Sequence, residues 1–173
     1  MQIELSSLPG KAGKFAHVYA PGGLALDDER VRLAVPPKVS GQITRNERKV
    51  VVEGQLNAVA GVECDRCLKP MELPIDAKFK VEYVTPATYN ASEVAELGED
   101  DLALSIFDGV LINIDDIVRE QVLLAVPSQA ICDENCKGLC PICGTDLNVA
   151  SCTCQVTEID PRWQGLKELV NGK

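Results

Sequence analysis

Eight cysteines gathered in two short stretches constrain the fold of this 173-residue chain more than any other feature. Six lie in ICDENCKGLCPICGTDLNVASCTC, residues 131–154, and two lie in VECDRCLKP, residues 62–70. The N-terminal residues contain no apolar core of signal-peptide length, and no apolar run approaches the roughly 20 residues that cross a bilayer. We therefore expect a cytoplasmic protein with no membrane contact. In that compartment thiols stay reduced, and clustered cysteines bind metal more often than they form disulfides.

The C-terminal cysteines have the spacing of a zinc knuckle. Zinc binds four soft ligands in a tetrahedron, and each short turn with two cysteines supplies two of them. In CPICG, Gly144 tolerates a positive φ, which lets the loop wrap around a metal. Cys152 and Cys154 would point to the same face of an extended strand. We predict a closed zinc site made of Cys140, Cys143, Cys152 and Cys154.

The other four cysteines, Cys64, Cys67, Cys132 and Cys136, can form a second zinc site that ties two distant parts of the chain together. Doubling the length of a closed loop costs about 0.6 kcal/mol, whereas a structural zinc supplies on the order of 10 kcal/mol. A rival assignment joins Cys132 or Cys136 to the CPICG pair, and the sequence leaves it open. Either way we expect two zinc ions, each with four protein ligands, as structural zinc has.

Alternating apolar and polar residues predict strands in the first ninety residues. Residues 50–59 and 73–84 both follow a period of two, which indicates strands with one face in water. They flank Cys64 and Cys67, so this pair should lie at the turn of a hairpin. The acidic stretch of residues 85–109 interrupts the pattern and reads as a solvated excursion between elements.

One helix is predicted from Asp115 to Val126, because Asn113 or Asp115 can cap it and Pro127 stops it. Asp115 and Arg119 have the spacing of an ion pair on one helix face. An apolar stripe should lie on the sheet, made of Ile114, Ile117, Val118, Val122 and Ala125. Asp160 followed by Pro161 predicts the start of a short terminal helix.

Together these elements predict an α+β fold. It consists mainly of an antiparallel β-sheet with one packed central helix, a C-terminal zinc knuckle and a short terminal helix. We expect two parts: residues 1–128 as the β-rich domain, and residues 129–173 as the cysteine-rich zinc-binding segment.

Charge is distributed unevenly along the chain, whose net charge is −9. Residues 1–90 carry 12 basic and 11 acidic residues, and residues 91–173 carry 5 and 15. An RNA contact would therefore lie in the first half, where dispersed basic side chains can bind phosphates without reading sequence. The candidate RNA-binding residues are Arg45, Arg48, Lys49, Arg66 and Lys69. The alternative is a solvated strand face, with a protein partner for the acidic half.

Nothing in the sequence predicts an enzyme or a small-molecule substrate. His17 is the sole histidine and stands in a strand-like segment without a paired thiol. There is no phosphate-binding loop, dinucleotide fingerprint or metalloprotease motif. A non-enzymatic role follows.

Four strings occur in one order: VECDRCLKP, IDDIVREQVLLAVP, CKGLCPICGTDLN followed by CxC, and DPRWQGLKEL. This combination resembles the YceD-like family, proteins required for accumulation of large-subunit ribosomal RNA, over roughly Val50 to Leu169. The resemblance implies a role in ribosome biogenesis, with large-subunit rRNA or a pre-ribosomal particle as the partner. The pair Cys64 and Cys67 matches the most widespread feature of the family, whereas the CPxCG and CxC cluster is absent from some members.

Two hypotheses of other classes remain. One is a thiol redox protein or redox-switched chaperone, in which Arg66 lowers the pKa of the Cys64 and Cys67 pair. The other is a zinc-dependent interaction module that acts outside the ribosome.

Overall fold

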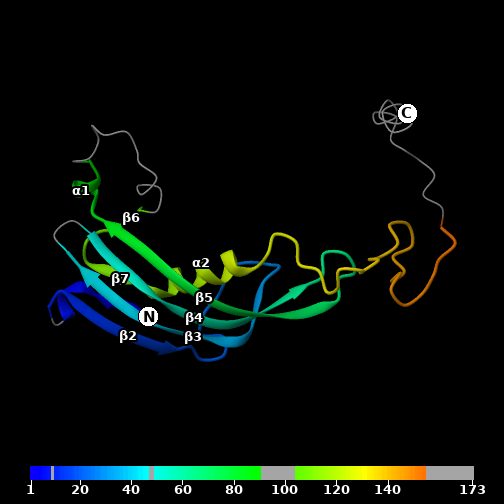
Figure 1. Cartoon of the computed structure of the whole chain (residues 1–173), viewed down its shortest axis with the longest axis horizontal. Helices are drawn as coiled ribbons and strands as arrows, with labels where there is room; N and C mark the ends of the chain where they lie inside the picture. The colour runs from blue at the N-terminus through cyan, green and yellow to red at the C-terminus, as the bar shows by residue number, and fades with distance from the viewer. Residues whose placement is uncertain (9, 47–48, 91–103, 155–173) are drawn as a thin grey trace.

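The computed structural model describes residues 1–8, 10–46, 49–90 and 104–154 of the chain. The strands in this part of the chain form a five-stranded sheet and a separate two-stranded one, and a helix lies along one face of the larger sheet (Figure 1). The elements are β1 (Gln2–Glu4), η1 (Leu5–Ser7), β2 (Ala12–Val18), β3 (Arg32–Arg45), β4 (Lys49–Glu63), β5 (Pro70–Val84), α1 (Pro86–Asn90), β6 (Leu104–Ile106), β7 (Leu111–Asn113) and α2 (Ile114–Ala125).

The large sheet has the order β2-β3-β4-β5-β6. Its first four strands are antiparallel neighbours, and β6 joins β5 in parallel. The small sheet pairs β1 with β7. This arrangement confirms the predicted α+β class, a mainly antiparallel sheet with one packed helix. The predicted terminal helix lies outside the described residues, and the division at residue 128 stays a prediction.

The predicted hairpin around the first cysteine pair is confirmed. Strands β4 and β5 pair without a break from Lys49 opposite Val84 to Glu63 opposite Pro70. Along β4 the even-numbered side chains such as Val52 and Leu56 are buried, whereas the odd-numbered ones are at least partly exposed. The sheet therefore has one face in water and one in the core, as the period of two predicts.

A pair of glycines makes room for two aromatic rings on the core face of the sheet. Gly41 in β3 lies directly opposite Gly54 in β4. A Cβ atom on Gly41 would lie 2.9 Å from Cζ of Phe15, and one on Gly54 would lie 2.9 Å from Cζ of Phe79. Both rings are buried over the glycine backbone, so any side chain at these two positions would displace core packing.

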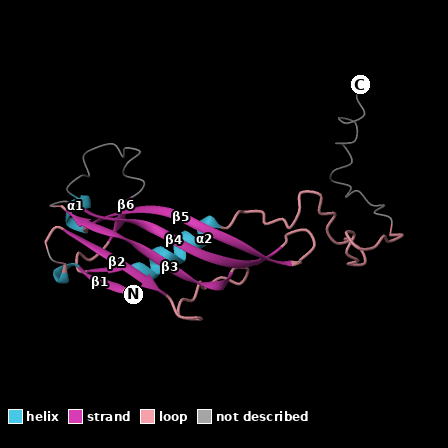
Figure 2. Ribbon diagram, turned by 60° about the horizontal axis from the view of Figure 1, so that its bottom comes forward, coloured by secondary structure: helices cyan, strands magenta, loops and turns pink. Residues whose placement is uncertain are grey.

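Helix α2 supplies the other side of the core (Figure 2). It begins at Ile114, one residue earlier than predicted, and the Asn113 side chain accepts a hydrogen bond from the Asp115 amide at 3.2 Å. Four members of the predicted apolar stripe are buried, but Ala125 is exposed, which contradicts its prediction. The last turn is anchored instead by Leu123 and Val126, which pack against the core.

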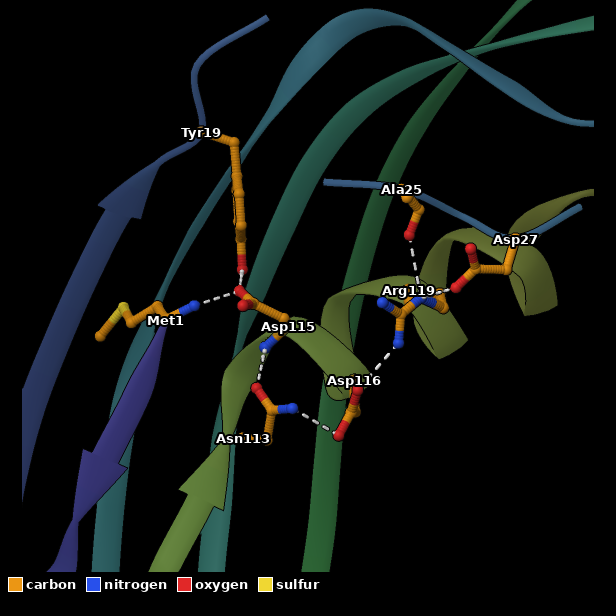
Figure 3. A network of polar contacts seen from close by, with 8 residues as sticks. All are labelled: Met1, Tyr19, Ala25, Asp27, Asn113, Asp115, Asp116 and Arg119. Carbon is orange, nitrogen blue, oxygen red and sulfur yellow. Dashed lines mark hydrogen bonds and ion pairs between the residues drawn. The ribbon is translucent and has the colours of Figure 1, made fainter. Parts of the chain in front are cut away.

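The predicted ion pair between Asp115 and Arg119 is wrong, because each side chain has other partners (Figure 3). Asp115 pairs with the N-terminal ammonium of Met1 and accepts a hydrogen bond from Tyr19 Oη at 2.6 Å. Burial alone would raise the pKa of the Asp115 carboxyl, but these two contacts hold it below its usual value. His17 lies in β2, and its ring meets that of Tyr19 edge to face.

Arg119 connects the helix to the loop between β2 and β3. Its Nη1 donates to Asp116 at 2.8 Å and its Nε donates to the carbonyl of Ala25 at 2.9 Å (Figure 3). Asp27 lies 3.5 Å from the same Nε. The loop is thereby tied over the helix, with Leu24 and Leu26 buried in the core.

Segments at the edges of the sheet complete the described structure. The predicted excursion of residues 85–109 contains α1 and β6, and its residues 91–103 lie outside the described part. Among the helices described, none is long and apolar enough to span a membrane.

Candidate metal centres

The structure gathers the eight cysteines into two groups of four. Within each group the sulfur atoms all lie within 4.8 Å of one another. We call Cys64, Cys67, Cys132 and Cys136 the hairpin quartet, and Cys140, Cys143, Cys152 and Cys154 the C-terminal quartet. These are the two groups that the cysteine spacing favoured. The alternative, in which Cys132 or Cys136 joins the CPICG pair, is not observed. Cys152 and Cys154 lie in irregular backbone rather than in the strand that was expected.

The sulfur separations in the hairpin quartet match a metal tetrahedron. A zinc–sulfur bond of about 2.3 Å places two ligands of a tetrahedron about 3.8 Å apart. Sγ of Cys64 lies 4.0 Å from Sγ of Cys136, and Sγ of Cys67 lies 3.6 Å from Sγ of Cys132. A disulfide would require about 2.05 Å. Four thiols at these distances are the donor set of structural zinc and can hold such an ion.

Both CxxC segments fold into the same turn. In the hairpin quartet the Cys64 amide donates to the carbonyl of Lys69 at 2.9 Å, and the Leu68 amide donates to the carbonyl of Cys64 at 2.8 Å. In the C-terminal quartet the Cys140 amide donates to Thr145 at 2.8 Å, and the Gly144 amide donates to Cys140 at 2.9 Å. Two separate sequences thus build one knuckle geometry, in which both sulfurs of a turn point to one side.

The residue after the second cysteine of each turn has a positive φ. Gly144 has a φ of +72°, as the CPICG motif predicts, whereas Leu68 has a φ of +58°. A non-glycine side chain in this region costs roughly 1–2 kcal/mol. The positive φ of Leu68 could not be predicted from the sequence, since leucine is not a residue typical of turns. Stabilising contacts elsewhere in the hairpin quartet therefore have to offset the cost of this backbone conformation.

The pKa is lowered for one thiol of the hairpin quartet, Cys64, and for two of the C-terminal quartet, Cys140 and Cys143. The Cys132 amide donates to Sγ of Cys64 at 3.4 Å and is the main reason that the pKa of Cys64 falls to about 6, against an opposing effect of burial. The Thr145 hydroxyl, 3.1 Å from Sγ of Cys143, is the main reason that the pKa of Cys143 also falls to about 6.

Neighbouring thiols keep their protons. Hydrogen bonding to Cys64 raises the pKa of Cys132 to about 12, and hydrogen bonding to Cys143 raises the pKa of Cys154 to about 12. Four sulfurs in contact cannot all be thiolates without a cation among them. Each quartet is therefore prepared to exchange its remaining protons for a metal ion.

Polar side chains in the hairpin turn hold the segment after α2 in place. Asp65 accepts from the amide of Ala130 at 2.7 Å and from Arg30 at 2.7 Å. Arg66 donates through Nη1 to the carbonyls of Glu134 at 3.1 Å and Cys136 at 2.9 Å. The two residues between Cys64 and Cys67 thus position the distant half of the hairpin quartet.

Asn148 links the two quartets. Its Nδ2 donates to Sγ of Cys136 at 3.5 Å, and its Oδ1 accepts from the amide of Lys137 at 2.8 Å. The amide of Leu139, next to Cys140, donates to the carbonyl of Arg66 at 3.0 Å. The C-terminal quartet is thereby attached to the wall of the hairpin quartet.

The candidate RNA-binding residues do not form one surface. Arg45 and Lys49 lie at one end of the sheet, and Arg66 and Lys69 lie at the other, roughly 45–50 Å away along β4. The guanidinium of Arg66 is held by loop carbonyls, while the side chain of Lys69 is exposed. Arg48 lies outside the described residues.

The fold and the cysteine geometry define an α+β protein with two four-cysteine sites, built from paired knuckle turns, that can hold metal ions. Its sequence matches the family described as large ribosomal RNA subunit accumulation protein YceD over residues 52–170. The chain belongs to this family, as its motifs predicted. The match begins within β4 and includes both quartets.

Known relatives are similar over most of the chain. The large ribosomal RNA subunit accumulation protein YCED homolog 1, chloroplastic, of Zea mays is 28% identical over 96% of the chain. An uncharacterized protein of Mycobacterium tuberculosis is 31% identical over 70% of the chain, and YlbN of Bacillus subtilis is 24% identical over 96%. The chain spans 62% of the maize protein, 56% of the mycobacterial one and 93% of YlbN. No solved structure shows significant similarity to it.

Proposed function

We propose that this protein is a non-enzymatic ribosome biogenesis factor that supports the accumulation of large-subunit rRNA, and that two zinc ions stabilise its fold. The family match over residues 52–170 carries this proposal. The maize relative is named for the same role, and the similarity covers 96% of the chain and 62% of that relative.

The proposed zinc ions have a structural role. Each quartet offers four cysteine sulfurs, and a tetrahedral zinc with four protein ligands leaves no position for a substrate or a reactive water. In the hairpin quartet the ion would join the β4–β5 turn to the segment after α2. In the C-terminal quartet it would close a short loop. This chemistry agrees with a protein that binds and stabilises rather than one that catalyses.

The proposed partner is a large-subunit precursor in the cytoplasm, either its RNA or a ribosomal protein on it. A chain of net charge −9 repels nucleic acid in bulk, so an RNA contact must be local. The acidic residues of the second half suit a basic protein instead. No small-molecule substrate is part of this proposal.

A thiol redox function is the second candidate, and the low pKa of Cys64 favours it. Reactive cysteines combine a low pKa with exposure. Cys64 is fully buried, and Cys67 and Cys136 are buried beside it. The burial favours metal ligation over thiol exchange.

Depletion of the protein tests the proposed function directly. We expect the ratio of large-subunit to small-subunit rRNA to fall, and tagged protein to sediment with large-subunit precursors. A zinc-dependent module that acts elsewhere would leave both unchanged. A redox protein would leave freely reacting thiols in the reduced protein and would not change the rRNA ratio.

A further inference from the structure

A cavity of about 400 Å³ lies at the end of the sheet opposite the cysteines. Its volume is within the range of ligand-binding pockets. Three of its lining residues are basic and, among the described residues that line it, none is acidic. We call it the basic pocket; its lining residues include Lys11, Arg45, Lys49, Tyr83, Phe107 and the buried pair Leu5 and Val50. In a chain of net charge −9, such a lining marks a site for an anion.

Strand pairing brings the basic side chains of the pocket together. Lys11 precedes β2 and Arg45 ends β3, and the Arg45 amide donates to the carbonyl of Lys11 at 2.7 Å. Neither side chain has an ion-pair partner among the described residues. Lys49 differs, because its ammonium pairs with Glu82. Within the described part of the chain, an anion at Lys11 and Arg45 would therefore displace no carboxylate.

Two aromatic rings form a second wall of the pocket. The centroids of Tyr83 and Phe107 lie 5.6 Å apart with the rings inclined at 65°. Both residues are half-buried, so part of each ring is accessible. Leu5 and Val50 also line the pocket, and both are buried, so they add apolar surface to it. Cations beside accessible aromatic rings suit a ligand that carries both a phosphate and a flat ring system.

A second cavity of the described chain has the opposite character. It lies beside Cys64 and also measures about 400 Å³. Its lining mixes Arg30 and Arg32 with four acidic residues, which are Asp28, Glu29, Glu63 and Asp65. Arg30 is already bound to Asp65 at 2.7 Å. A phosphate would meet net negative charge there. A third cavity, of about 450 Å³, is lined by Lys14 and Lys78 but also by Glu53, and no aromatic side chain among the described residues lines it. Of these three cavities, the basic pocket best fits a ligand with both a phosphate and a ring.

We propose that the basic pocket binds one nucleotide of an RNA strand, with the phosphate between Lys11 and Arg45 and the base against Tyr83 and Phe107. This inference rests on the proposed function and names the surface that performs it. The contacts read the phosphate and the flat face of a base, so they hold the strand without selecting a sequence.

Binding of a fluorescently labelled single-stranded RNA, followed by anisotropy at several salt concentrations, tests the pocket. Lys11→Gln and Arg45→Gln should each weaken binding about threefold to tenfold and lower the slope of log affinity against log salt by about 0.7–1, the loss of one phosphate contact. Lys38→Gln is the matched control, since Lys38 is an exposed lysine in the middle of β3. Equal effects of all three substitutions, or none, would overturn the proposal.

The aromatic wall needs its own variant. Phe107→Leu keeps an apolar side chain and should weaken RNA binding about fivefold or more, because stacking on one base contributes 1–3 kcal/mol. Its binding of inorganic polyphosphate should not change. If RNA and polyphosphate lose affinity equally, or neither does, no base is seated there. If uridine monophosphate displaces RNA at micromolar concentrations, the pocket is a free-nucleotide site and the assignment to a strand is wrong.

An experiment in cells distinguishes a failure of the pocket proposal from a failure of the proposed function. The Lys11→Gln and Arg45→Gln double variant should lose sedimentation with large-subunit precursors and reduce large-subunit rRNA, while its melting temperature and zinc content stay those of the wild type. If the double variant supports normal rRNA levels, the pocket is not the contact, although the proposed function stands. If loss of the wild-type protein itself leaves rRNA levels unchanged, the proposed function fails.

Discussion

Replacing Cys64 with serine removes one sulfur from the hairpin quartet and releases a long loop. The quartet joins Cys67 to Cys132, which are 65 residues apart. A cross-link of that span lowers the entropy of the unfolded chain by an amount worth about 4 kcal/mol at 25 °C. That is a large share of the 5–15 kcal/mol by which proteins are usually stable. For a chain of this size the loss corresponds to a fall in Tm of roughly 9–17 °C.

Replacing Cys152 with serine is the matched control, because it breaks the C-terminal quartet by the same chemistry. Cys143 and Cys152 are nine residues apart, so the equivalent contribution is about 2.5 kcal/mol and is confined to a short loop. Circular dichroism of the sheet should show a large fall in Tm for Cys64→Ser and little change for Cys152→Ser.

Amide exchange locates the damage in each variant. Cys64→Ser should expose the Ala130 and Leu139 amides, whose acceptors Asp65 and Arg66 lie in the hairpin turn. Cys152→Ser should expose Gly144 while Ala130 stays protected. The prediction is that the hairpin quartet stabilises the sheet and the C-terminal quartet only its own loop. An equal fall in Tm and an equal global loss of protection in both variants would refute it.

Three further predictions concern metal and charge. Protein purified without chelator should contain close to two zinc ions per chain and few reactive thiols; metal analysis that finds none, with eight reactive thiols, contradicts the zinc assignment. Asp115→Asn should lower the free energy of unfolding above about pH 4, and the difference from wild type should shrink as pH falls through the depressed pKa of Asp115, since a carboxyl of lowered pKa stabilises the fold only while ionised; urea unfolding from pH 7 down to the most acidic pH at which the protein stays folded measures it, and a difference that stays constant or grows as pH falls refutes it. Changing Glu93, Glu96 and Glu99, all outside the described residues, to glutamine should preserve or strengthen RNA association, because repulsion falls; loss of association in a sedimentation assay would point to a basic protein as the partner instead.

Local patterns predicted much of this structure. The alternation in residues 50–59 and 73–84 fixes which side chains face the core, and a CxxC between two such runs can only lie at their turn. Spacing favoured the observed grouping of the cysteines, since each CxxC turn presents two sulfurs, but it left open which pair Cys132 and Cys136 would join. Helix α2 was predicted to within one residue because Asn113 and Pro127 mark its ends.

Contacts between residues far apart in the chain could not be predicted from the sequence. In the sequence Arg66 is a basic residue in a turn with no predicted partner, but the fold brings the carbonyl groups of Glu134 and Cys136 to its guanidinium. Lys11 was overlooked because only the pairing of β2 with β3 places it beside Arg45. The partner of Asp115 was misassigned for the same reason, since helix spacing cannot reveal a tyrosine 96 residues away.

The sequence separation between the cysteines of the hairpin quartet also determines when the quartet can assemble during translation. Cys64 and Cys67 leave the ribosome first, and Cys132 follows 65 residues later. At synthesis rates of 5–20 residues per second, about 3–13 s pass before the third ligand is made. During that interval the nascent chain carries an open dithiol, because the Cys132 amide that lowers the pKa of Cys64 in the folded protein has not yet been made. The hairpin quartet can therefore form only after translation of the sheet. If it binds zinc as proposed, the yield of folded protein should depend on the zinc supply at that stage.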